Sequence, residues 1–130
     1  MEKKDKELLL KDLCGRLPYL ENWVRYDGKD YVVTGYGHGR VSLLSSMFSS
    51  GVGHCPLVEE VKPYLRPMSS MTEEERETYR NLQHDVWCNE YSPTYYESIA
   101  SLDWLNKNMF DYRGLIPHGL AIEAPEGMYN

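Results

Sequence analysis

The sequence predicts a small α+β domain, in which an N-terminal helix and a small curled antiparallel sheet or SH3-like barrel precede two C-terminal helices. Up to about residue 65, short runs typical of strands alternate with glycine-rich turns. After residue 72, apolar residues recur at spacings of three and four, which is the period of a helix packed on one side. With 130 residues, the chain is expected to form one domain, residues 1–130, with its own hydrophobic core.

The first helix is expected over residues 6–14. Asp5 is a suitable N-cap, because its carboxylate accepts hydrogen bonds from the first helical amides. Gly15 is a suitable stop, because glycine readily takes the left-handed conformation that ends many helices. Four residues form the apolar side of this helix: Leu9, Leu10, Leu13 and Cys14. We expect the rest of the domain to cover them.

A β-hairpin is expected next, from two β-type runs at residues 23–26 and 31–34. Asp27-Gly28 lies between them and readily supplies the positive φ angles of a tight turn. Residues 35–39 are expected to form the following turn, and residues 40–44 a third strand. A fourth strand is expected over residues 57–65, ending or lying at a sheet edge near Pro63, because proline cannot donate to a strand ladder.

A helix start is predicted at Thr72, which has the spacing of a capping box with Glu75. In this motif the Thr hydroxyl accepts from the amide of Glu75, while the Glu75 carboxylate accepts from the amide of Thr72. The helix is expected to run from Glu73 to the mid-80s. Its buried side should include Tyr79, Leu82 and Val86.

The last helix is expected within residues 94–108, because Ser92-Pro93 reads as an N-cap followed by the first helical residue. Five apolar residues follow at helical spacing: Tyr95, Ile99, Leu102, Leu105 and Met109. Residues 115–122 are too apolar to remain in solvent, so we expect them to pack back and pair with the sheet. Residues 124–130 are expected to fray.

The composition predicts a cytoplasmic protein. The chain has no apolar stretch near the roughly 20 residues that a membrane span needs, and the apolar trio 8–10 is too short for a signal-peptide core. Its 3 cysteines are widely spaced and odd in number, which disfavours a disulfide framework. The net charge is −6 and no long basic run occurs, which disfavours nucleic acid as a partner.

A possible interaction surface is suggested by the unusual aromatic content, which is 11 Tyr and 3 Trp against 2 Phe. Tyr and Trp pack a ring on apolar neighbours while keeping a polar tip hydrated, so they suit interfaces as well as sheet faces. Met47 and Phe48 add two apolar residues to a loop rich in Ser and Gly. The candidate interaction residues are Trp23, Tyr31, Tyr36, Arg40, Met47 and Phe48.

No catalytic, metal or cofactor site is predicted. His54-Cys55 and the pair His84 and Cys88 could supply four ligands to zinc if they converged. Neither pair has the C-x2-C spacing that makes structural zinc sites recognisable, so satisfied histidines and buried thiols are the preferred interpretation. Cys55 beside His54 is the only local candidate for a nucleophile with a base, and adjacent residues seldom orient toward each other productively.

Parts of the chain resemble a group of short uncharacterised proteins carried by gut Bacteroides and by their phages or mobile elements. The resemblance lies in LLLKDLC (residues 8–14), KPYLRPMSSMTEEE (62–75), DWLN (103–106), FDYRGLI (110–116) and GLAIEAP (119–125). It implies an accessory protein of bacterial or phage origin and assigns no catalytic residue.

The function that these observations favour is the binding or regulation of another protein, without catalysis. An alternative is a nucleic-acid-associated small-barrel module, in which Trp23, Tyr31, Tyr36 and Arg40 stack and pair with bases. A third interpretation is an enzyme with a His/Cys site. The oligomeric state is not indicated by the sequence.

Overall fold

The computed structural model of the chain describes residues 2–19, 22–45, 53–87 and 95–129, and within 83–87 and 95–99 it describes the helical backbone alone. The helices are α1 (Lys3–Arg16), α2 (Glu73–Trp87) and α3 (Tyr95–Lys107). The strands are β1 (Trp23–Tyr26), β2 (Lys29–Gly37), β3 (Arg40–Leu44), β4 (Lys62–Leu65) and β5 (Ile122–Glu123). The predicted α+β class is confirmed.

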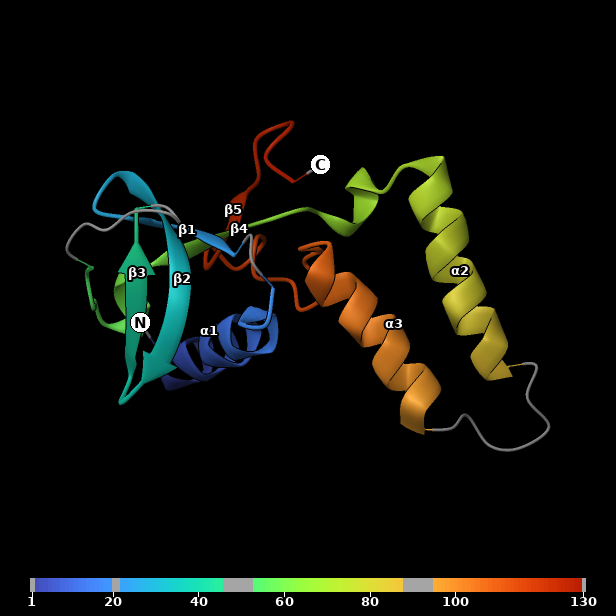
Figure 1. Cartoon of the computed structure of the whole chain (residues 1–130), viewed down its shortest axis with the longest axis horizontal. Helices are drawn as coiled ribbons and strands as arrows, with labels where there is room; N and C mark the ends of the chain where they lie inside the picture. Colours follow the sequence, from blue (N-terminus) through green and yellow to red (C-terminus); the bar gives the residue numbers. More distant parts are fainter. Residues whose placement is uncertain (1, 20–21, 46–52, 88–94, 130) are drawn as a thin grey trace.

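The five strands form one sheet in the order β3-β2-β1-β4-β5. Every pairing is antiparallel except the last, in which β5 runs parallel to β4. Figure 1 shows α1 against one face of the sheet, whereas α2 and α3 lie side by side away from it. None of the described helices is long and apolar enough to cross a membrane.

The predicted hairpin is confirmed, with Trp23 opposite Val32 and Tyr26 opposite Lys29. Asp27 and Gly28 have φ angles of 50° and 76°, as a two-residue turn of this kind requires. The third strand also has its predicted bounds. The next turn is shorter than predicted, because β2 continues to Gly37 past an irregularity at residues 33–35 and only His38 and Gly39 have positive φ.

The prediction for the fourth strand was wrong in two respects. Its first part is a short 3-10 turn, Val58–Glu60, and β4 begins only at Lys62. In addition, β4 lies inside the sheet between β1 and β5. Pro63 is tolerated there because the paired part of β5 begins opposite Tyr64, one residue further along, so Pro63 has no partner residue on that side.

Helix α1 is longer than predicted at both ends. It begins at Lys3, so Asp5 lies in the first turn and is not the cap, and it passes through Gly15 to end at Arg16. Cys14, predicted on the apolar side, is exposed. The buried residues of the helix are Leu9, Asp12, Leu13 and Arg16, so two of the four are charged.

Helix α2 begins as predicted. The amide of Glu75 donates to Thr72 Oγ1 at 3.2 Å, and the amide of Thr72 donates to Glu75 Oε1 at 3.0 Å, which is the reciprocal pair of a capping box. Helix α3 lies within its predicted range, but Leu102 is 40% exposed, so its place in the buried stripe was wrong. Ser92-Pro93 and the side chains of Val86, Tyr95 and Ile99 lie outside the described residues.

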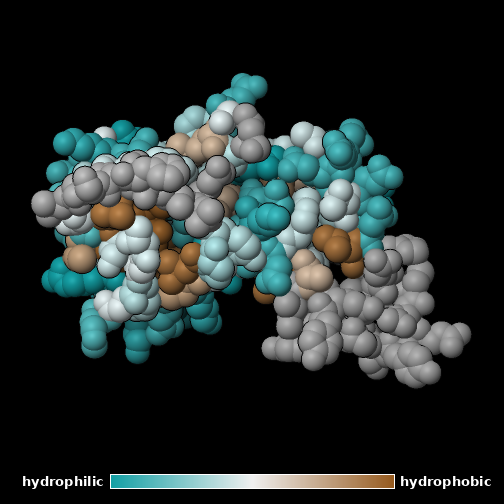
Figure 2. All heavy atoms as spheres, viewed as in Figure 1, coloured by the Kyte–Doolittle hydropathy of each residue, from teal (hydrophilic) through white to brown (hydrophobic). Residues whose placement is uncertain are grey.

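Two hydrophobic clusters stabilise the fold. The larger packs α1 against the sheet and includes Leu115, Leu120 and Ala121, so residues 115–122 do pack back on the sheet as predicted. The smaller lies between the start of α2 and the end of α3, around Met71, Leu105 and Phe110. Figure 2 shows hydrophobic residues in view at two corresponding places, beside the sheet and near α2 and α3, on a surface that is otherwise largely hydrophilic.

Candidate functional site

The C-terminal turn, defined here as residues 124–129, is held against β4. The amide of Ala124 donates to the Leu65 carbonyl at 2.8 Å, and the Tyr129 hydroxyl donates to the Tyr64 carbonyl at 2.8 Å. Between these anchors the amide of Met128 donates to the Pro125 carbonyl at 3.1 Å. The prediction that this segment frays was therefore wrong. It builds part of the surface.

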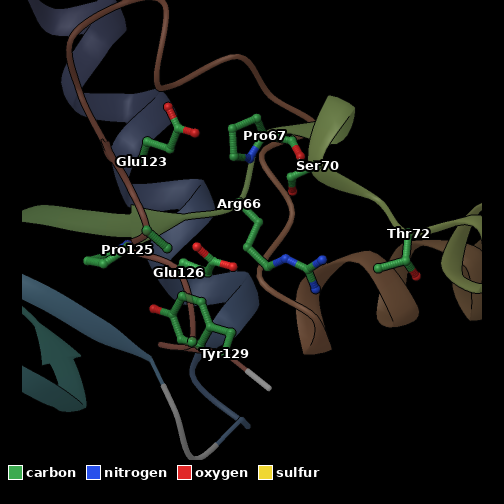
Figure 3. Close-up of a pocket in the computed structure, with 10 residues that line it drawn as sticks. Arg66, Pro67, Ser70, Thr72, Glu123, Pro125, Glu126 and Tyr129 are labelled. Carbon is green, nitrogen blue, oxygen red and sulfur yellow. Dashed lines mark hydrogen bonds between the residues drawn. The ribbon is translucent and has the colours of Figure 1, made fainter.

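A first cavity, of about 380 Å³, lies between the C-terminal turn and the chain that leads from β4 to α2. Figure 3 shows Arg66 running through the middle of its lining, with Glu126 and Tyr129 on the side of the turn and Thr72 on the side of α2. The Arg66 guanidinium is already paired with both Glu75 carboxylate oxygens at 2.8 and 2.7 Å. The strongest polar group of this cavity is thus used by the protein itself.

A second cavity, of about 400 Å³, lies on the other side of the same turn and is here called the Trp23 cavity. Its lining residues are Trp23, Asp30, Pro125, Glu126, Gly127 and Met128. Trp23 and Asp30 share the sheet face opposite α1, because Trp23 alternates with the buried Val24 and Arg25 is the register partner of Asp30. The cavity therefore combines an indole ring and two carboxylates with the apolar groups of the turn.

The polar groups of the Trp23 cavity are only partly used. Asp30 Oδ1 accepts a hydrogen bond of 2.6 Å from the Tyr64 hydroxyl. Burial and this hydrogen bond both raise the pKa of Tyr64, so its phenol stays protonated and keeps donating. Glu126 makes no hydrogen bond or ion pair with the part of the chain that the structure describes, and no described ring stacks on Trp23.

The interaction residues predicted from the sequence do not form one surface. Trp23 and Arg40 lie on the face opposite α1, whereas Tyr31 and Tyr36 are register partners of Val24 and Val41 on the α1 side. Tyr31 is 7% exposed and belongs to the core, while Tyr36 is 38% exposed. Met47 and Phe48 lie outside the described residues.

The two neighbouring residues His54 and Cys55 point in opposite directions. The His54 ring packs edge-on against Tyr31, with ring centroids 5.2 Å apart, on the α1 side of the sheet. Cys55 Sγ lies 3.8 Å from Ser42 Oγ, and Ser42 is on the other face. Cys88 and the His84 side chain lie outside the described residues. Among the residues that the structure describes, no group of three or more His, Cys, Asp or Glu could hold a metal ion.

Sequence reasoning missed a largely buried charge network between α1 and residues 106–113. Arg16 donates to both oxygens of Asp12 at 2.9 Å and to the Phe110 carbonyl at 2.6 Å, and both side chains are 0% exposed. Arg113 also donates to Asp12 Oδ1, at 3.0 Å. Asp12 and Arg16 each lie three residues after a buried leucine, Leu9 and Leu13 respectively, so the helical spacing places both charges on the buried side, and this was the available signal. The bonds of Arg16 to the Asn106 and Phe110 carbonyls, and of Arg113 to Asp12, join α1 to residues 106–113.

Comparisons with known proteins give no relative for this chain. No protein-family model, no curated protein and no solved structure matches it.

Proposed function

We propose that the chain is a small protein-binding accessory protein that contacts its partner through the C-terminal turn and the two cavities beside it. The observation that carries this proposal is the position of residues 124–129 between two open cavities of about 380 and 400 Å³. Cavities of this size are within the range that binds small ligands and protruding side chains. The half-buried Trp23 supplies the kind of ring that dominates binding energy at interfaces.

The nucleic-acid alternative receives less support. A base-stacking platform needs aromatic rings along one surface, whereas Trp23 lies on one face of the sheet and Tyr31 and Tyr36 on the other. The carboxylates of Asp30 and Glu126 beside Trp23 would also repel phosphates. The third interpretation, a His/Cys enzyme, would need His54 and Cys55 to face each other.

We further propose a cytoplasmic location, which the two unpaired thiols Cys14 and Cys55 support. The bacterial or phage origin stays an expectation from the resemblance.

Site-specific photo-cross-linking tests the proposed surface. A benzophenone amino acid placed at Met128 is expected to yield a discrete protein adduct in cells that carry the gene, because Met128 lines the Trp23 cavity. The same label at Tyr36, exposed on the opposite face, is the control and is expected to give none. Adducts at both positions, or at neither, would overturn the proposed surface. Retention on single-stranded DNA at low salt that is lost in Trp23→Ala would favour the nucleic-acid module.

A further inference from the structure

We infer that the Trp23 cavity binds the cationic side chain of a lysine or arginine in a basic segment of the partner protein. This inference rests on the proposed function and specifies the chemistry of the partner. It follows from the walls of the cavity, from the charges that the protein leaves unpaired there, and from the charge of the whole chain.

The walls suit a cation carried on an apolar stem. The face of an indole ring attracts ammonium and guanidinium groups, and Trp is the strongest of the aromatic side chains in this respect. Pro125 and Met128 supply apolar surface for the methylene groups of such a stem, while Asp30 and Glu126 supply carboxylates for its charged end. The cavity of about 400 Å³ has room for a side chain of this length.

The protein's own cations leave these carboxylates available. The ion pairs of the described residues use Glu59, Asp12, Glu75 and Glu73, and none of them involves Asp30 or Glu126. Arg25 is the register partner of Asp30 and Lys62 is the register partner of Arg25, so both lie on this sheet face, one row beyond Trp23. Neither of them lines the cavity, whose lining contains two carboxylates and no lysine or arginine.

Charge complementarity favours a basic protein segment over other occupants. The chain has 20 acidic against 14 basic residues, so its long-range field attracts a basic partner and repels a nucleic acid. A segment with several Lys or Arg residues would gain from this field as well as from the cavity. A free small amine would gain only from the cavity.

Titration of the full chain with defined peptides tests the inference, with the indole N–H resonance of Trp23 as the readout at the site. The first probe is a nine-residue Gly-Ser peptide with three basic positions, each Arg or Lys. The second is the same peptide with Glu at these three positions, and the third is lysine amide. We expect saturable shifts of the Trp23 resonance with the basic peptide only. Equal affinity for lysine amide would overturn the basic segment, and an equal response to the acidic peptide would overturn the cation.

Two single variants separate the cavity from general charge attraction. Glu126→Gln is expected to weaken binding of the basic peptide by about tenfold, which is the order of one charge-assisted contact. Glu77→Gln removes the same charge from an exposed residue of α2 that lines neither cavity, so its effect should be at most about twofold. Equal weakening by both variants would overturn the inference. A protein that cross-links at Met128 and tolerates Glu126→Gln would overturn the cationic ligand and keep the protein-binding function.

Discussion

Arg66 links the end of β4 to both α2 and the aromatic stack at the end of α3. Its guanidinium carbon lies 4.2 Å from the centre of the Phe110 ring, and Phe110 stacks on Trp104 with centroids 5.5 Å apart. The same guanidinium pairs with Glu75, the residue that completes the capping box of α2. One side chain at the end of β4 thus fixes both the start of α2 and the aromatic stack at the end of α3.

The Arg66 pair makes stability depend on pH in the acid range. The hydrogen bonds from Arg66 are the largest cause that lowers the pKa of Glu75, and the amide of Thr72 adds to them. A carboxylate whose pKa is lowered by folding stabilises the folded state fully at pH values above its unfolded-state pKa of about 4.3. This stabilisation is lost as the pH falls from that value through the lowered pKa. We expect Glu75→Gln to be less stable than wild type at pH 7 and to approach it at pH 3 in urea denaturation. Glu74→Gln, on the exposed side of the same turn, should show no such convergence.

The buried Asp12 network gives a second prediction at this scale. Asp12→Ala leaves the fully buried Arg16 guanidinium without its carboxylate, and breaking a buried pair in this way costs about 3–5 kcal/mol of unfolding free energy. Glu7→Ala, exposed on the same helix, should change stability by less than about 0.5 kcal/mol. Similar denaturation midpoints for the two variants would mean that the network contributes little to stability.

Among the elements, α2 is fixed by its cap. Thr72→Ala removes the acceptor for the Glu75 amide and is expected to lower the unfolding free energy by about 1 kcal/mol. Thr78→Ala is the matched control, because Thr78 lies inside α2 and its hydroxyl bonds only to the Glu74 carbonyl one turn back. We expect no loss there, since alanine is the better helix former. Chemical denaturation of both variants checks this.

The attachment of α3 depends on Trp104, which stacks between Tyr79 of α2 and Phe110 with centroid distances of 5.8 and 5.5 Å. Trp104→Ala should cost about 3 kcal/mol, the low end for a large aromatic, because the ring is only half-buried. Leu102→Ala, 40% exposed on the same helix, should cost less than about 0.5 kcal/mol. Comparable losses in the two variants would mean that Leu102 is packed as tightly as Trp104, in contradiction to its exposure in the structure.

Elements governed by nearest neighbours were predictable from the sequence, whereas for distant contacts the sequence indicated that residues 115–122 pack on the sheet and not which strand they pair with. The Asp27-Gly28 turn and the Thr72–Glu75 capping box each lie within four residues, so local chemistry decides them. The parallel pairing of β5 with β4 joins residues about 60 positions apart, and no local pattern specifies such a pairing. The candidate site depends on the same pairing, because β5 delivers the C-terminal turn to Trp23.

For the whole molecule, the structure separates two packed parts joined through residues 104–113. The larger cluster holds α1 and the sheet, and the smaller one holds α2 and α3. Residues 104–113 contact both, because Phe110 belongs to the smaller cluster while its carbonyl accepts from the buried Arg16 of α1. The side chains of this segment therefore couple the α2–α3 pair to the rest of the fold.

Stability of this whole arrangement is expected not to depend on a metal ion. His54 and Cys55 lie on opposite faces of the sheet, so the two cannot ligate one ion without rearranging the strand-like segment that pairs with β3. A structural zinc site contributes its binding free energy directly to folding, so removing the ion would lower the melting temperature visibly. We expect protein purified without added zinc to hold well under one equivalent of metal and to melt at the same temperature with and without a chelator. Stoichiometric zinc that disappears together with stability in the double variant His84→Ala, Cys88→Ala would contradict this and would make His84 and Cys88 ligands.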